Sequence, residues 1–442
     1  METWTPTAAV YAESLARTYE YRTTGVPTTP QIRWSFVLKP GARITCPILV
    51  SQDRVYVADS AGYLTALDAP SGDLVWSFPT DWVENPKKTF HFGREGVTAF
   101  CLDGGLGYVA SARDMLYELD LHTGQVLRSW NPYREDAVFD ATGIEMLFIH
   151  NNLLFFVWVT NLHSDPRVCW YSDPGIYRFH PSTEERFIDM IPLHGWDFLP
   201  SICQRSNGEP DIVFALLNDF RRGSQFTAAE LPGASPDDPV RELWFNGDYD
   251  NDLFMDGSPD DLMDDTKNTC REVGLIFCSN TPVMDGVLYA FTPDGPWDED
   301  EEGSEDEMPA LLALDPQSGA VKWRTTFPSD FFSVRLVAAS NQIFLVAKNR
   351  VESIDVKTHQ PRWNWEAAFP VCHALVADGL LYVLGVQGEI IALEVSTGAR
   401  RWSWQVEGEI LKDWSTIDKG TLFLATTRAL CALSSCVSGG QD

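Results

Sequence analysis

The chain has 442 residues, and its 63 Asp and Glu against 33 Lys and Arg give a formal net charge of −30 at pH 7. Nucleic-acid backbones and anionic membrane surfaces are bound through basic side chains, so this balance disfavours both partners. Hydrophobic residues make up 44% of the chain, which is ordinary for a globular protein and too much for general disorder. The composition therefore predicts a folded acidic protein with no nucleic-acid and no membrane partner.

The first thirty residues predict an extension that precedes the repeats. Thr5-Pro6, followed by an alanine-rich stretch, predicts a short capped helix over residues 7–19. Glu2 stands where a secretory signal has basic residues, and no stretch approaches the roughly 18 apolar residues that span a bilayer. The nine cysteines are odd in number and form no Cys-x-x-Cys pair. We therefore predict reduced thiols and a cytoplasmic location.

A repeated pattern of strands dominates the rest of the chain. The clearest copy covers residues 55–78, and further copies begin near residues 107, 310, 343 and 380. Each contains two alternating strands, an acidic residue at the end of the second, a Ser/Thr-Gly turn and a third strand that carries tryptophan. Apolar residues at every second position, interrupted by Gly, Asp and Asn, are typical of antiparallel hairpins.

Degenerate copies cover residues 153–188 and 211–245, and the last copy, residues 421–436, lacks the tryptophan strand. Residues 31–38 supply a strand of this kind with Trp34, so we expect them to complete the last copy and close a ring. The turn that follows the second strand recurs at positions 68, 120, 180, 230, 315, 355, 394 and 431. The repeats therefore predict an all-β, eight-bladed β-propeller of four-stranded antiparallel blades over residues 31–436, with a tail at 437–442.

Two acidic insertions interrupt the later repeats, at residues 246–268 and 293–309. Runs of like charge repel one another and predict solvated loops, with docking of a basic partner as the alternative. The alternate aspartates that begin at Asp248 resemble a calcium loop, but Leu253 replaces the required glycine and Pro259 the last carboxylate. We therefore predict no metal site.

The repeats carry the motif A-L-D-x-x-[ST]-G-x-x-x-W, with tryptophan at Trp76, Trp323, Trp363 and Trp402. Over residues 31–436 this pattern resembles the PQQ-like β-propellers, which include quinoprotein dehydrogenases and outer-membrane assembly lipoproteins. The resemblance implies that each tryptophan docks one blade against the next. It implies little about function, because one fold serves many activities.

Two departures separate the chain from the known uses of this scaffold. Quinoprotein alcohol dehydrogenases need a quinone, a metal ion and typically a disulfide of adjacent cysteines, whereas this chain has no Cys-Cys pair. The assembly lipoproteins carry a lipobox cysteine near their start, and none is present here. We therefore predict no cofactor and neither of these uses.

Candidate site residues come from the start of each predicted inner strand, because these positions converge on the axis of a propeller. Arginines there would clamp an anion, tryptophans would stack on an apolar body, and a histidine beside a carboxylate would move protons. The predicted catalytic residues are His373, Asp413 and Glu145. The predicted ligand-binding residues are Arg94, Glu95, Trp196, Asp197, Arg335 and Trp414.

Two functions remain open at this point. The first is a monomeric, non-catalytic module that binds a small-molecule ligand or a protein partner. The second is a cofactor-independent enzyme, a cyclase, isomerase, lyase or hydrolase, that acts on a small organic molecule in the central funnel. A structural explanation competes with both, since charged residues near an axis often pair with each other and His373 lies in an otherwise apolar strand.

Overall fold

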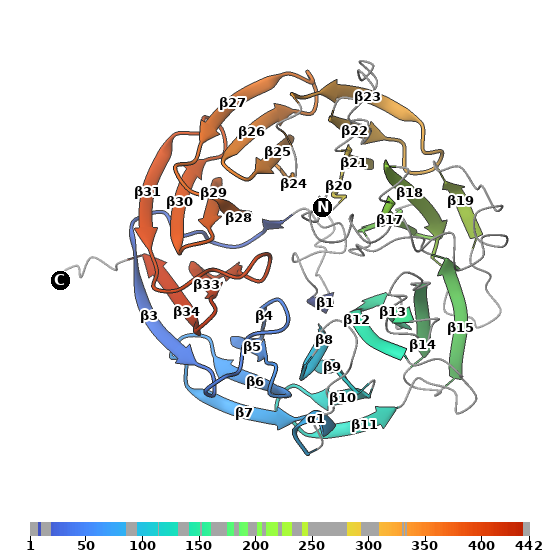
Figure 1. Ribbon diagram of the computed structural model, residues 1–442, viewed down its shortest axis with the longest axis vertical. Coiled ribbons are helices and arrows are strands. Elements are labelled where there is room, and N and C mark those ends of the chain that lie inside the picture. The colour runs from blue at the N-terminus through green and yellow to red at the C-terminus, as the bar shows by residue number, and fades with distance from the viewer. Residues whose placement is uncertain are drawn as a thin grey trace, which may run out of the picture.

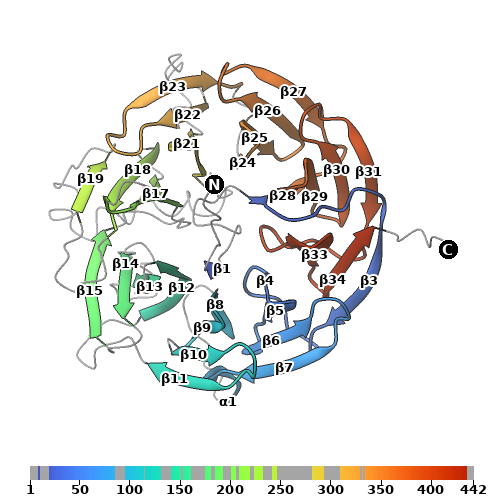
Figure 2. The ribbon, with the colours of Figure 1, turned by 180° about the vertical axis from the view of Figure 1, so that it is seen from behind.

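In the computed structural model, antiparallel sheets form a ring around a central axis, and both views show the same closed arrangement (Figures 1 and 2). The structure describes residues 8–9, 19–84, 95–113, 115–130, 141–150, 153–160, 175–180, 185–192, 201–205, 209–219, 223–231, 241–245, 281–292, 309–328, 331 and 334–435. Both predicted acidic insertions and the C-terminal tail lie outside these residues, except for Pro309.

Four blades come from the first half of the chain, each named by its strands from the axis outward. The first contains β4 (Leu49–Ser51), β5 (Arg54–Ala58), β6 (Tyr63–Asp68) and β7 (Leu74–Pro79), and the helix α1 (Asp81–Glu84) follows it. The second contains β8 (Val97–Asp103), β9 (Leu106–Ser111), β10 (Leu116–Asp120) and β11 (Val126–Trp130). The next two contain β12 (Ala141–His150), β13 (Leu153–Thr160), β14 (Gly175–His180) and β15 (Glu185–Pro192), then β16 (Ser201–Cys203), β17 (Ile212–Asp219), β18 (Gly223–Glu230) and β19 (Arg241–Phe245).

The second half of the chain forms the remaining sheets. One contains β20 (Val283–Met284), β21 (Val287–Thr292), β22 (Ala310–Leu314) and β23 (Val321–Thr326). Two more contain β24 (Arg335–Ala339), β25 (Gln342–Ala347), β26 (Arg350–Asp355) and β27 (Pro361–Glu366), then β28 (Val371–Ala377), β29 (Leu380–Gly385), β30 (Glu389–Glu394) and β31 (Arg400–Gln405). The closing sheet combines β32 (Thr416–Asp418), β33 (Thr421–Ala425) and β34 (Ala429–Ser435) with β3 (Pro30–Val37).

The predicted fold of eight like blades is wrong, because seven blades are each built from four consecutive strands. The closing sheet differs from them: as the sequence predicted, it takes its outer strand, β3, from the other end of the chain. Two blades carry a fifth strand on their inner edge, and one of these strands pairs in parallel. A blade's inner strand has one unpaired edge of backbone N–H and C=O groups, so a segment near the axis can add to it.

The N-terminal segment supplies both additional strands. β1 (Ala8–Ala9) pairs with β8, and β2 (Glu20–Tyr21) pairs in parallel with β28. The predicted helix over residues 7–19 is therefore wrong at Ala8–Ala9, where tertiary pairing with an inner strand overrides the local helix preference of alanine. No helix in the described part of the chain is long and apolar enough to cross a bilayer.

The repeated motif joins neighbouring blades. In the β4–β7 blade, the carboxylate of Asp68 accepts hydrogen bonds from the backbone N–H and the hydroxyl of Ser71, which closes the turn before Gly72. Gly72 has φ +77°, and a Cβ on it would lie 2.5 Å from the Trp34 ring of the closing sheet. The indole Nε1 of Trp34 donates to the Ala69 carbonyl at 2.9 Å. Glycine is required because the docked ring lies where a side chain would be.

The docking pattern recurs around the ring and changes at the closing sheet. Trp76 donates to the Leu121 carbonyl at 3.0 Å, and Trp363 donates to the Val395 carbonyl at 2.9 Å, in each case on the next blade. The last of the series, Trp402, instead donates to the carbonyl of Val26 in the N-terminal segment at 2.8 Å. Val26 thus replaces the turn that the closing sheet lacks.

Candidate functional site

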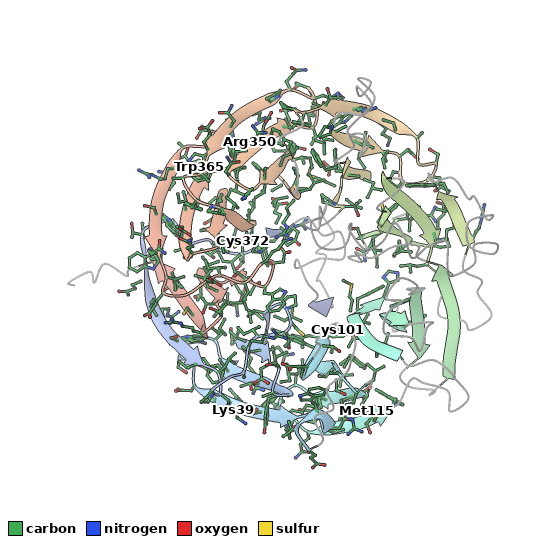
Figure 3. All side chains as sticks on the ribbon, in the orientation of Figure 1. Lys39, Cys101, Met115, Arg350, Trp365 and Cys372 are labelled. Carbon is green, nitrogen blue, oxygen red and sulfur yellow. The ribbon has the colours of Figure 1, made fainter. Side chains whose placement is uncertain are left out.

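Three of the predicted residues meet near the axis, at the inner edges of three adjacent blades. Arg335 begins β24, His373 lies in β28, and Asp413 precedes β32, with a left-handed backbone at φ +68°. Cys372, beside His373, lies on the inner side of its blade in Figure 3. We call Arg335, His373 and Asp413 the polar trio. Because the repeats place these positions at equivalent points of consecutive blades, their alignment in the sequence predicts that they meet.

The polar trio is an ion pair with a neutral histidine beside it. The Arg335 guanidinium forms an ion pair with Asp413 Oδ1 and also donates to the Cys372 carbonyl at 2.9 Å. His373 Nδ1 lies 3.3 Å from Asp413 Oδ1, but the two atoms are not aligned for a hydrogen bond. Burial and the Arg335 charge lower the pKa of His373 to about 3. The imidazole is therefore uncharged at neutral pH.

The N-terminal segment covers His373 of the polar trio. The ring of Tyr19 packs edge-on against His373 with centroids 5.4 Å apart, and both side chains are fully buried. Tyr19 has φ +58°, and its carbonyl accepts a hydrogen bond from the Val376 N–H of β28 at 2.9 Å. His373 is thus enclosed between its own strand and a segment about 350 residues away in sequence.

Residues 19–26, which we call the N-terminal strap, continue from the axis across the β28–β31 blade (Figure 1). Thr23 Oγ1 accepts from the Lys419 N–H at 2.7 Å, and the Thr24 carbonyl accepts from the Gly420 N–H at 2.8 Å. The Val26 N–H donates to the Tyr382 hydroxyl at 2.6 Å. The strap is therefore fixed at its outer end to two blades.

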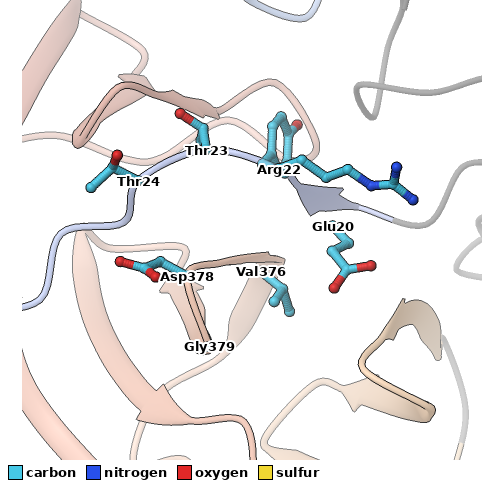
Figure 4. Close-up of a pocket in the computed structure, with 8 residues that line it drawn as sticks. Glu20, Arg22, Thr23, Thr24, Val376, Asp378 and Gly379 are labelled. Atoms are coloured by element: carbon cyan, nitrogen blue, oxygen red, sulfur yellow. The ribbon is translucent and has the colours of Figure 1, made fainter. Parts of the chain in front are cut away.

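A polar cavity of about 760 Å³ opens between the strap and the turn that joins β28 to β29 (Figure 4). Glu20, Arg22, Thr23 and Thr24 line it from the strap, and Asp378 lines it from the turn. Burial raises the pKa of the Glu20 carboxyl, and the neighbouring Arg22 charge opposes that effect. No member of the polar trio lines this cavity.

Of the other predicted site residues, the structure describes the side chains of Glu95 and Trp414, and both make contacts away from the polar trio. Glu95 is exposed and lies 3.8 Å from Arg43 in an ion pair. Trp414 is half-buried and packs with the apolar residues shared by the closing sheet and the β4–β7 blade. Glu145 lies in β12, but its side chain is outside the described residues. Arg94, Trp196 and Asp197 are outside the described residues.

Sequence reasoning missed Tyr19 and a second buried histidine pair. Tyr19 and Tyr21 alternate with Glu20, a β-strand signal that the predicted helix concealed. His150, at the end of β12, places Nε2 3.0 Å from the Asp211 carboxylate, and both are largely buried. In the sequence, His150 ends one apolar strand and Asp211 directly precedes another. These two positions, on hairpins of adjacent blades, are the signal from which the pair could have been predicted.

The described residues near the axis do not fit a quinone and its metal ion. Hard cations in such a site need several converging oxygen ligands. Within the described ranges, no three His, Cys, Asp or Glu side chains come together, and the Asp413 carboxylate is engaged by Arg335. The five described cysteines are all unbridged, and burial raises the pKa of the Cys372 thiol to about 12.

The outer rim carries a distinct apolar feature. Seven large hydrophobic side chains are exposed among the described residues, and six of them lie on the outer strands β3, β7 and β11. These three strands follow one another around the ring (Figures 1 and 2). The six residues, which we call the outer apolar belt, are Ile32, Val37, Leu74, Val75, Val126 and Leu127.

Comparison with known proteins finds a family that resembles part of the chain. The family described as outer membrane protein assembly factor BamB matches residues 280–370 and 364–436. No curated protein sequence matches the chain. Among solved structures, BamB from Moraxella catarrhalis is 11% identical, with a TM-score of 0.54, over 92% of this chain and 100% of that chain.

Two dehydrogenases are also similar in fold. Quinohemoprotein alcohol dehydrogenase from Comamonas testosteroni is 11% identical, with a TM-score of 0.61, over 96% of this chain and 80% of that chain. A europium-containing methanol dehydrogenase is 10% identical, with a TM-score of 0.62, over 97% and 98% of the two chains. Identities this low establish the fold and not the activity. The ring of blades, the docking tryptophans and the match over residues 280–436 together make the chain similar in fold to the PQQ-like β-propellers.

Proposed function

We propose that this protein is a non-catalytic, cytoplasmic module that binds a protein partner through the outer apolar belt. The exposed fractions of the belt residues carry the proposal, with Val37 at 72%, Leu74 at 61% and Leu127 at 50%. Exposed apolar residues that gather on one part of a protein commonly mark a protein interface. A protein partner also agrees with the matched family, whose description names an assembly factor.

Another outer strand of the ring carries charged residues at positions where the belt has aliphatic ones. At the positions held by Leu74 and Val75 in β7, the outer strand β31 carries Arg400 and Arg401. The same strand position is therefore compatible with charge elsewhere in the ring. Fold maintenance alone does not require aliphatic residues there, which favours an interface.

The alternative, a cofactor-independent enzyme that uses His373 and Asp413, has less support. The imidazole is fully buried under Tyr19, and its lowered pKa favours the neutral form. Asp413 is already paired with Arg335. An acid–base pair must reach the proton that it transfers, and these side chains are occupied by contacts between blades.

The test uses photo-crosslinking residues at positions 74 and 127, with position 321 as the matched control. Val321 is 56% exposed on β23, outside the belt. We expect positions 74 and 127 to capture the same protein, which is then identified, purified and titrated against the variants. A Leu74→Lys/Leu127→Lys double variant should bind it at least 10-fold more weakly, and Val321→Lys should bind it normally. Equal binding by the double variant would exclude the belt as the interface.

A further inference from the structure

The inner edge of β28 accepts an extended segment as an additional strand. The blade order β28-β29-β30-β31 leaves this edge of β28 without a partner from its own blade. Glu20 pairs with Val376 and Tyr21 pairs with Ala377, in parallel, and the Val376 N–H bonds the Tyr19 carbonyl. Strand addition of this kind is a common way to bind peptides, because the backbone groups supply affinity for many sequences.

The side chains of residues 19–21 are packed differently beside this edge. Tyr19 is fully buried against His373 and packs with Val337 of β24 and Val376 of β28. Tyr21 is 6% exposed and packs in the neighbouring core. Glu20, between them, faces the polar cavity of Figure 4. The segment that pairs with this edge thus has the order aromatic, polar, aromatic, with both tyrosines buried and with Glu20 and Tyr21 both contributing to the lining of the cavity.

The resident strand is short, and its anchors lie after it in the chain. β2 contains only two residues. The outer end of the strap is held separately, through Thr23, Thr24 and Val26. The contacts that hold the outer end of the strap are therefore separate from the pairing of residues 19–21 with β28.

We propose that the inner edge of β28 is a peptide-binding site. Its ligand is an extended segment of a partner protein with two aromatic residues flanking one polar residue, bound parallel to β28, and Tyr19–Tyr21 is the resident competitor. When the resident strand is displaced, Glu20 and Arg22 leave the cavity with it. The incoming segment then contacts Asp378, in the turn between β28 and β29. This site is separate from the outer apolar belt, and neither proposal depends on the other.

The experiment measures binding in trans of the segment that now occupies the site. The probe is a fluorescein-labelled peptide LARTYEYRTT, which corresponds to residues 15–24, and the readout is fluorescence anisotropy. A variant that lacks residues 1–21 keeps the anchors from Thr23 onward and should bind this peptide saturably. The intact chain should bind it at least 10-fold more weakly, because its own strand competes. A peptide with the Tyr19→Ala substitution should also bind the truncated variant at least 10-fold more weakly.

A full-length variant covers the case in which truncation prevents folding. Tyr19→Ala/Tyr21→Ala weakens the resident strand without shortening the chain, and it should bind the unsubstituted peptide more tightly than the intact protein does. Failure of a folded variant to bind the peptide, or equal binding by the intact chain, would overturn the proposal. Dimers formed by the intact chain and lost on truncation would also overturn it, because a second copy would then be the occupant.

Discussion

Acid should destabilise this protein through His373. The side chain is fully buried, and its pKa is lowered to about 3 in the folded state, against an ordinary value of 6.5. Between these two values the unfolded chain binds a proton that the folded chain excludes, so stability falls as the pH falls below 6.5. The slope is about 1.4 kcal/mol for each pH unit, which amounts to about 2 kcal/mol at pH 5.

Urea unfolding of the wild type and of His373→Phe and His373→Gln variants, between pH 7.5 and pH 5, measures this contribution. The absolute stabilities of the variants will differ, but their pH slopes should be shallower than that of the wild type by the amount above. All other titrating groups are shared, so the difference in slope isolates this histidine. Identical slopes for the three proteins would show that His373 takes up a proton in the folded state, and the description of the trio would be wrong.

Two predictions concern the tryptophan docks. Gly72→Ala should cost about 3 kcal/mol of unfolding free energy, since the new Cβ meets the Trp34 ring, whereas Gly41→Ala, with φ +82° and open space, should cost about 1 kcal/mol. A similar loss at both positions, measured by urea unfolding, would refute the steric argument. Trp402→Phe removes an indole hydrogen bond to the N-terminal strap and should cost about 1 kcal/mol more than Trp404→Phe, whose Nε1 has no hydrogen-bond partner among the described residues. Equal losses in thermal and urea unfolding would show that the bond to the strap contributes nothing.

The repeats could be predicted from sequence because their signals are local. The Asp-turn-Gly-Trp spacing forms one hairpin and its dock, as Asp68 and Gly72 show, and period-two alternation marks the strands. The approach of Arg335, His373 and Asp413 could also be predicted, since equivalent positions of consecutive repeats face the same axis. Their role in binding or catalysis remains a prediction.

The N-terminal strap could not be predicted, because its partners are remote. Tyr19 pairs with a strand about 350 residues later, and no short-range pattern identifies which inner edge it takes. At Ala8 and Ala9 the local sequence favoured the wrong element, since helix preference is weak beside an available strand edge. Trp414 follows Asp413 directly, but it is half-buried and packs against the core shared by the closing sheet and the β4–β7 blade, and its role in binding a ligand remains a prediction.

Because the ring closes through β3, it can close only after the last strand has been synthesised. Pro30 pairs with Ser435, so the outer strand of the closing sheet has no partner until almost the whole chain has been made. At 5–20 residues per second, roughly 400 residues take on the order of 20–80 s, far longer than a hairpin needs to form. During that time β3 presents Ile32 and Val37 with an unpaired backbone, while later blades can already assemble. The order of the strands thus leaves the N-terminal end of the chain available to chaperones, and to mispairing, until the ring closes.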